Sequence, residues 1–161
     1  MTTPPLHPLP PVSAGVSTPT EVAAFFDLDH TIVRGNTGAM FMRDMVKTGD
    51  LSISRIPKLA WVLACYKFAA IDMARVLDDS ARMFRNTLEM DMRLRCERLV
   101  EESVSPFVST AAREAIKAHQ RLGHTVVLLT AQTQYIAEPV CRLLGIEHWL
   151  CTRLSVSGGL L

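Results

Sequence analysis

The stretch AAFFDLDHTIV, residues 23–33, decides the fold class of this chain. An apolar run leads to Phe26, and two carboxylates follow it at Asp27 and Asp29. The run predicts a short buried strand, but acids at its end cost desolvation free energy unless they are paired, hydrogen-bonded or bound to a cation. Two interpretations follow: the strand ends in solvent, or it delivers two acids to a cation.

The composition indicates a globular chain of single-domain size. Its 161 residues are 48% apolar and 20% charged, which is typical of a folded domain. The net charge of +1 gives no field that would favour nucleic acid or an anionic surface. The four cysteines form no CxxC pair, so we expect reduced thiols rather than a zinc site. Since we find no signal peptide and no apolar segment long enough to cross a bilayer, we expect a cytoplasmic protein without a membrane span.

Three regions of the chain differ in their pattern. Residues 1–20 hold six of the nine prolines, which predicts a disordered, extended tail. Residues 34–104 carry a helical pattern over most of their length, which predicts a block of helices inserted after the first strand. The flanking residues 21–33 and 105–161 are predicted to form the core together.

The order strand, helical block, helix, strand, helix, strand predicts an α/β fold with a parallel sheet. Continuous apolar runs predict strands that are buried on both faces. Gly123 and Gly145 are predicted to close the two helices of the core. The predicted core elements are a strand at 21–27, a helix at 105–124, a strand at 124–130, a helix at 132–146 that bends at Pro139, and a strand that begins in EHWLCTR.

Ligands of such sheets bind at the carboxyl ends of the strands, and two strand ends carry polar residues. Asp27 and Asp29 alternate with Leu28, so both acids can face one site. Residues 130–132 are predicted to open a helix, whose free N–H groups suit an anion. These parts describe phosphoryl transfer: one carboxylate attacks phosphorus, the second transfers protons, and Mg²⁺ neutralises the charge.

The sequence FFDLDHTIV and the later sequence VVLLTAQT resemble motifs I and II of the haloacid dehalogenase (HAD) superfamily. The helical block after motif I and the run LLGIEHWLCTRLSVSGG resemble subfamily IB, which contains the phosphoserine phosphatases. The resemblance covers residues 21–161. It implies a HAD-like Rossmannoid core with a helical cap at 34–104, and a Mg²⁺-dependent phosphatase that acts on a small phosphorylated substrate through an aspartyl-phosphate.

The same resemblance implies a role for each motif residue. Asp27 corresponds to the nucleophile and a metal ligand, and Asp29 to the general acid/base, which also binds the metal through its backbone carbonyl. Thr130 taken alone is equally well explained as a helix N-cap, and His30 as a plain loop residue. The residues that the resemblance assigns to phosphate binding are Leu28, His30, Thr31, Thr130 and Ala131.

One departure from the subfamily concerns the substrate. Asn36 stands where phosphoserine phosphatases carry a glutamate that recognises an ammonium group. A neutral amide does not supply that charge-assisted hydrogen bond, so we do not expect phosphoserine as the substrate. The apolar segment 56–71 has two interpretations: a site for a hydrophobic phosphate ester, or packing inside the cap.

A second departure concerns completeness. The lysine of motif III and the acids of motif IV are not found up to Leu161, and two acids alone bind Mg²⁺ weakly. We therefore expect a truncated chain whose site is completed by a missing C-terminal part or by a homo-oligomer, without a nucleic-acid partner. Three functions stay open: a phosphatase that is incomplete in this chain, a catalytically inactive phosphate-binding or regulatory module, and a phosphotransferase.

Overall fold

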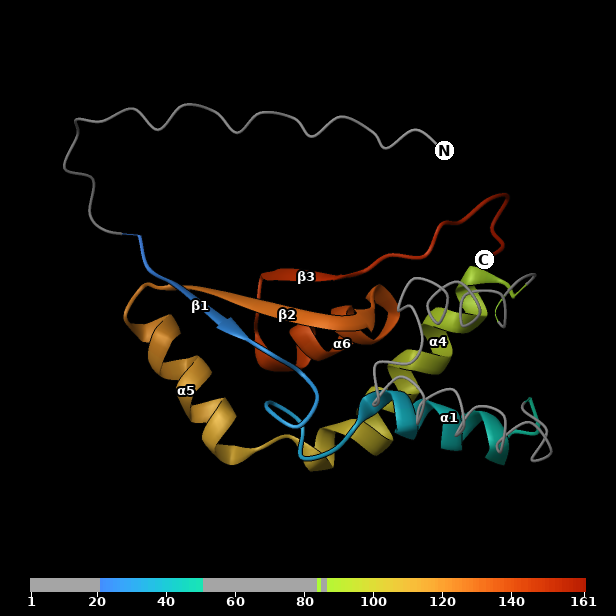
Figure 1. Ribbon diagram of the computed structural model, residues 1–161, viewed down its shortest axis with the longest axis horizontal. Coiled ribbons are helices and arrows are strands. Elements are labelled where there is room, and N and C mark those ends of the chain that lie inside the picture. Colours follow the sequence, from blue (N-terminus) through green and yellow to red (C-terminus); the bar gives the residue numbers. More distant parts are fainter. Residues whose placement is uncertain (1–20, 51–83, 85–86) are drawn as a thin grey trace, which may run out of the picture.

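The structure is a computed structural model that describes residues 21–50, 84 and 87–161 (Figure 1). The proline-rich tail, the apolar segment 56–71 and Cys65 lie outside these residues, so the predictions made for them stay predictions. The described elements are, in chain order, β1 (Ala23–Phe26), α1 (Thr37–Lys47), α4 (Glu89–Leu99), the π-helix η2 (Val100–Val104), the 3-10 helix η3 (Ser105–Phe107), α5 (Thr110–Arg121), β2 (Thr125–Thr133), α6 (Gln134–Leu144) and β3 (His148–Thr152).

The three strands form one parallel sheet in the order β1-β2-β3, with β2 in the middle (Figure 1). In the register of the sheet, Phe26 pairs with Leu128 and Leu128 pairs with Trp149. Parallel strands separated by helices confirm the predicted α/β fold. Because parallel strands end at the same edge of the sheet, the residues after β1 and those at the end of β2 lie next to each other.

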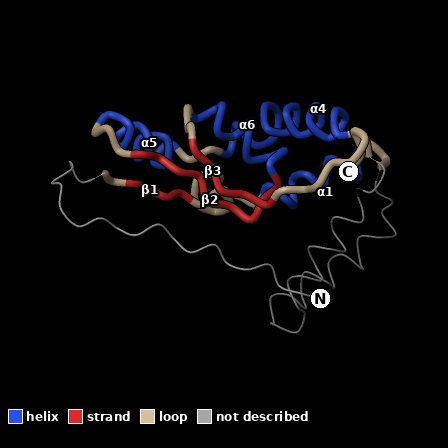
Figure 2. The backbone as a smooth tube through the Cα atoms, turned by 90° about the horizontal axis from the view of Figure 1, so that it is seen from above, coloured by secondary structure: helices blue, strands red, loops and turns tan. Residues whose placement is uncertain are grey.

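One face of the sheet carries the core. Figure 2 shows α5 and α6 on the same side of the three strands, and Leu128, Ile116 and Val140 are buried between these layers. Side chains alternate along a strand, so neighbouring residues point to the other face. There Phe25 and Leu150 are 59% and 56% exposed. The prediction that both faces are buried was therefore wrong for the described residues, because no described helix covers the second face.

The end of β2 differs from the prediction. The strand continues to Thr133, and α6 begins only at Gln134. A register irregularity between Leu129 and Thr133 lets pairing with β3 resume beyond the predicted end of the strand. Residues 130–132 therefore lie in the strand, and the prediction that they open a helix, with Thr130 as its N-cap, was wrong. The N-cap position of α6 is Thr133.

The helices of the core begin and end close to their predicted positions. Gly123 and Gly145 follow the ends of α5 and α6 with φ of 70° and 65°, the left-handed conformation that glycine adopts without strain. Both predicted helix ends are confirmed. α5 is shorter than predicted at its start, because residues 105–107 form the separate 3-10 helix that contains Pro106. Pro139 lies inside α6 and is buried.

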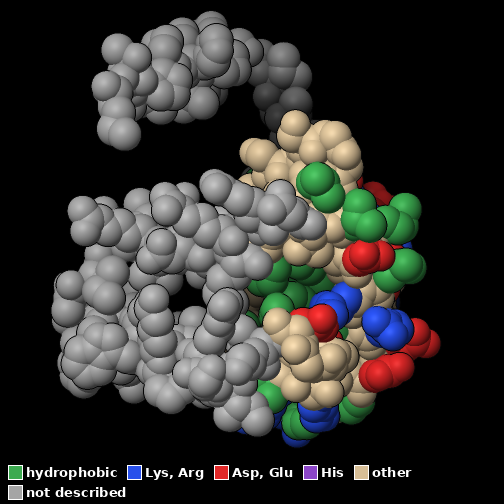
Figure 3. Space-filling view, turned by 90° about the vertical axis from the view of Figure 1, so that its right-hand side faces the viewer, with side chains coloured by type: hydrophobic (Ala, Val, Ile, Leu, Met, Phe, Trp, Pro, Cys, Tyr) green, Lys and Arg blue, Asp and Glu red, His purple; other side chains and the backbone are tan. Residues whose placement is uncertain are grey.

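Ion pairs join α4 to its neighbours. Arg93 contacts Glu138 of α6 at 2.9 Å, Arg95 contacts Asp44 of α1 at 3.4 Å, and the Arg142–Glu97 pair joins α6 to α4 at 2.6 Å. Figure 3, which faces the end of the molecule near α4 and the end of α1, shows charged side chains of both signs among scattered apolar ones. Among the described residues, no helix is long and apolar enough to cross a membrane.

Candidate active site

The loop after β1 is a compact turn anchored in the core. Leu28, Ile32 and Val33 are fully buried. The N–H groups of Ile32 and Val33 donate to the carbonyl oxygens of Asp27 (3.3 Å) and Leu28 (2.9 Å), which closes the turn. Since Leu28 points into the core, the acids on either side of it are directed away from the core. The sequence thus fixes the position of both carboxylates through one buried leucine.

His30 and Thr31 continue this loop, and both are exposed. His30 has φ of 60°, a left-handed conformation that is uncommon for residues other than glycine. Its N–H donates to the carbonyl oxygen of Gly35 (3.0 Å) and is therefore already used within the loop. No described oxygen accepts the N–H of Asp29 or of Thr31, so these two backbone donors are available to an anion.

The two acids of motif I have different surroundings. Asp27 is exposed, and its carboxylate accepts one long hydrogen bond, from the Thr31 hydroxyl to Oδ2 (3.4 Å). Asp29 is half-buried and accepts three short ones. Oδ1 accepts from the N–H and the hydroxyl of Thr37 (2.7 Å each), and Oδ2 accepts from Nε2 of Gln132 (2.8 Å). One acid is therefore held firmly in place while the other is left open.

Thr37 and Gln132 are site residues that the sequence analysis did not single out. Thr37 is fully buried and begins α1, so the positive end of the helix dipole also favours the Asp29 carboxylate. Gln132 lies 103 positions after Asp29 and reaches it from the end of β2. The only signals in the sequence were a threonine just after motif I and a glutamine just after Thr130, and neither indicates a partner.

Thr130 lies at the same strand end and is almost fully buried. Its hydroxyl accepts a hydrogen bond from the N–H of Gln132 (3.1 Å). The neighbouring Ala131 is exposed, and its carbonyl oxygen accepts from the hydroxyl of Thr152 on β3 (2.8 Å). The sheet thus brings the end of motif II against the acids of motif I, as parallel strands require.

The donors that this site offers to a cation are oxygens. The Asp27 carboxylate is exposed, and no hydrogen bond from a described residue reaches the carbonyl oxygen of Asp29. Hard oxygen donors on an open surface fit Mg²⁺, which keeps part of its water shell in proteins. Within the described part of the chain, no group of three or more acids, histidines or cysteines is arranged to hold a metal. The described residues therefore provide part of a magnesium shell.

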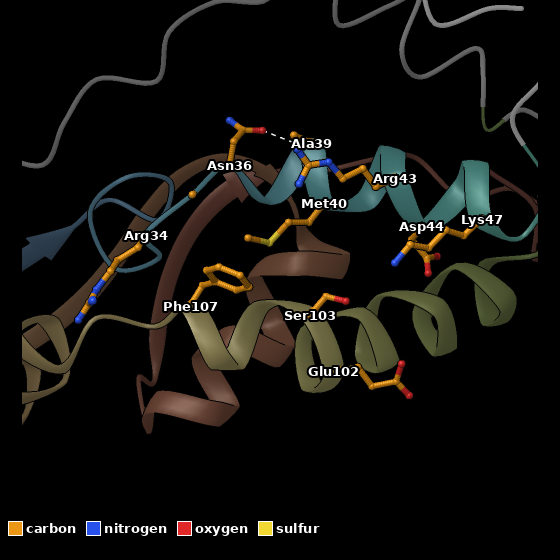
Figure 4. Close-up of a pocket in the computed structure, with 11 residues that line it drawn as sticks. Arg34, Asn36, Ala39, Met40, Arg43, Asp44, Lys47, Glu102, Ser103 and Phe107 are labelled. Atoms are coloured by element: carbon orange, nitrogen blue, oxygen red, sulfur yellow. Dashed lines mark hydrogen bonds between the residues drawn. The ribbon is translucent and has the colours of Figure 1, made fainter. Parts of the chain in front are cut away.

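A groove of about 520 Å³ lies beside the loop, between α1 and η2 (Figure 4). Figure 4 shows Met40 and Phe107 pointing toward each other inside it, while Arg34 extends away from Asn36 on the other side of the loop. Asn36 caps α1, because its side-chain oxygen accepts from the N–H of Ala39 (2.8 Å). The groove is therefore lined by both apolar and charged side chains, and its cations do not converge on one point.

A family model described as haloacid dehalogenase-like hydrolase matches residues 24–161. The chain belongs to this family. The match includes both motifs, so the resemblance expected from the sequence is confirmed. A probable phosphatase of Mycobacterium tuberculosis strain H37Rv is 28% identical over 154 residues, which is 93% of this chain and 54% of that protein. The haloacid dehalogenase-like chain described here thus spans about half the length of this curated relative.

Two solved structures share its fold. A protein of unknown function from Bordetella pertussis Tohama I superposes with a TM-score of 0.80 at 17% identity, covering 89% of this chain and 65% of that one. A phospho-aspartyl intermediate analogue of phosphoserine phosphatase superposes with a TM-score of 0.61 at 16% identity, covering 88% and 60%. The predicted likeness to the fold of phosphoserine phosphatases is therefore confirmed.

Proposed function

We propose that this chain carries the nucleophile and the acid/base of a Mg²⁺-dependent phosphatase that hydrolyses small phosphoric monoesters. The observation that supports the proposal most is the contrast between the two acids. A nucleophile must approach phosphorus, and Asp27 has only one long hydrogen bond from the described residues. An acid/base must be held in one orientation, and Asp29 accepts three bonds of 2.7 to 2.8 Å.

The reaction proceeds in two displacements. A carboxylate oxygen of Asp27 bonds to phosphorus while the bond from phosphorus to the ester oxygen breaks, and Asp29 gives its proton to the leaving alcohol. In the second step Asp29 takes a proton from water, whose oxygen bonds to phosphorus. The bond between phosphorus and Asp27 breaks, and inorganic phosphate leaves. Mg²⁺, when bound by the Asp27 carboxylate and the Asp29 carbonyl, supplies charge that compensates the negative phosphate and nucleophile.

The phosphate is held by the residues around the two acids. The N–H groups of Asp29 and Thr31 are donors without an acceptor among the described residues. The Thr130 hydroxyl provides a further donor from β2. Leu28, His30 and Ala131 contribute by shaping the backbone of these two segments, because the His30 N–H is already bonded to Gly35. This assignment supports a ligand of three or four oxygens rather than an extended surface.

The test uses the full chain with Mg²⁺ and 4-nitrophenyl phosphate. We expect Asp27→Asn to abolish turnover, and Asp29→Asn to lower kcat by about 10² or more, since water is then activated without a base. During turnover Asp29→Asn should accumulate a phosphoryl group on Asp27, detected by intact mass and peptide mapping. The matched control is Asp91→Asn, an exposed acid on α4. Turnover that survives Asp27→Asn would contradict the proposal.

One observation favours a second candidate, a phosphate-binding or regulatory module without turnover. The described residues hold no third acid beside Asp27 and Asp29, so the charge near the nucleophile is weakly compensated. Binding of inorganic phosphate without hydrolysis of any ester would support this candidate. A phosphotransferase differs from both, because added glycerol would then yield glycerol phosphate in place of free phosphate. The hydrophobic ester suggested by residues 56–71 stays a prediction.

A further inference from the structure

We propose that Gln132 is a positioning residue for proton transfer: together with Thr37 it fixes which oxygen of Asp29 exchanges the proton. The inference rests on the acid/base role proposed for Asp29. Gln132 belongs to β2 and not to the loop that carries the acids, so its contact is not a consequence of local chain geometry. The distance from its Nε2 to Oδ2 of Asp29 is 2.8 Å.

The hydrogen bonds of Asp29 leave one position open for a proton. A carboxylate offers about four lone-pair sites, two on each oxygen. Both sites on Oδ1 are used, because the N–H and the hydroxyl of Thr37 donate to it at 2.7 Å. Gln132 occupies one site on Oδ2. The remaining site on Oδ2 is the position that can hold and release a proton, and Gln132 determines its direction.

The amide of Gln132 is itself confined. A Cβ added at Gly38 would lie 3.3 Å from Nε2 of Gln132 and 3.2 Å from the Asn36 side-chain oxygen, so the first turn of α1 packs closely against this amide. On its other side, the backbone N–H of Gln132 donates to the Thr130 hydroxyl (3.1 Å). The glutamine is thus held between α1 and β2, and it transmits their relative position to Asp29.

A structural role alone predicts a different result from a positioning role. If Gln132 only satisfied a half-buried carboxylate, its loss would lower stability and reduce the turnover of every substrate equally. If it directs the proton, its loss affects substrates according to their leaving group. An alkyl oxygen needs a proton as it leaves, whereas the 4-nitrophenolate oxygen leaves without one. The value of kcat/KM reports the first displacement, in which this proton is given.

The experiment compares Gln132→Met, which keeps the length of the side chain, with wild type on butyl phosphate and 4-nitrophenyl phosphate with Mg²⁺ present. We expect kcat/KM to fall roughly tenfold or more for butyl phosphate and less than about threefold for 4-nitrophenyl phosphate. Calorimetric affinity for inorganic phosphate should stay within about twofold. Gln120→Met is the matched control, because its amide donates to the Gly145 carbonyl (2.7 Å) at the other end of β2.

The outcomes are distinct. Equal losses on both esters, or no loss, would overturn the positioning role and leave the proposed function intact. A wild-type chain that hydrolyses neither ester would overturn both. If Gln132→Met does not fold, Thr37→Val and Thr37→Ser serve instead, since valine removes the hydroxyl bond to Oδ1 and serine retains it. The valine variant should then show the selective loss on butyl phosphate and the serine variant should restore it. Equal behaviour of the two would contradict the inference.

Discussion

At the scale of single residues, the chain uses identical side chains for different tasks. Asp27 and Asp29 are two positions apart, yet one is exposed with a single long hydrogen bond and the other is fixed by three. The difference comes from Leu28, which is buried and turns the backbone between them. The identities and spacing of the acids were predictable from the sequence, whereas the partners of Asp29 were not, because Gln132 meets it only through the folded sheet.

The N-cap of α1 gives a prediction at this scale. Asn36 accepts from the N–H of Ala39 at 2.8 Å, and Thr37, the partner of Asp29, is the next residue. Asn36→Ala should lower the free energy of unfolding by about 1 kcal/mol, because it leaves a helix N–H without its acceptor. Asn36→Asp is the control: it keeps the acceptor and places a negative charge at the helix N-terminus, so stability should be retained. Urea unfolding measures both, and equal losses would contradict the capping role.

At the scale of elements, the sequence predicted the strands and their order better than their ends. Alternating strands and helices were sufficient to predict the parallel sheet. The extension of β2 to Thr133 was not predictable, because it depends on pairing with Thr152 and on the bond from Thr152 to the Ala131 carbonyl. Such contacts join segments that a local pattern treats separately. The exposure of Phe25 was missed for a related reason, since an apolar run does not specify which face of a strand is covered.

The position of α4 gives a prediction at this scale. Arg93 bonds to Glu89 within α4 and to Glu138 of α6, both at 2.9 Å, and its guanidinium lies 5.4 Å from the centre of the Tyr135 ring. These acids raise the pKa of Arg93, which therefore stays charged. Because the pair is partly exposed, Arg93→Ala should cost only about 1 kcal/mol in urea unfolding, less at high salt. Arg98→Ala, on the same helix and without an acidic partner among the described residues, should cost less. Equal costs would contradict the bridging role.

At the scale of the whole molecule, burial controls the chemistry of the thiols. Cys96 and Cys141 are buried and form no disulfide. Burial is the main cause that raises the pKa of each to about 12. A thiolate is therefore disfavoured inside the fold at both positions, and neither thiol is a candidate nucleophile.

Two results are expected from variants that retain one of these cysteines. At pH 8 a thiol reagent should react only as fast as the protein unfolds, and urea should accelerate the reaction. Stability should also fall as pH rises above about 8.5, because the unfolded thiol then loses its proton while the folded one keeps it. Cys151 is half-buried and serves as the comparison, since it should react faster. Rapid labelling of Cys96 in the absence of urea would contradict this account.

The hydrogen bond between Gln132 and Asp29 also bears on the order in which the chain assembles. Its partners are 103 positions apart, whereas the bonds from Thr37 span eight. Loop-closure entropy opposes the long connection until strand pairing compensates for it, while the short one forms locally. Asp29 therefore acquires its Thr37 bonds early and its Gln132 bond only when β2 has docked against β1. An unfinished fold thus holds a loosely oriented acid, so that chemistry at this site begins only once folding is complete.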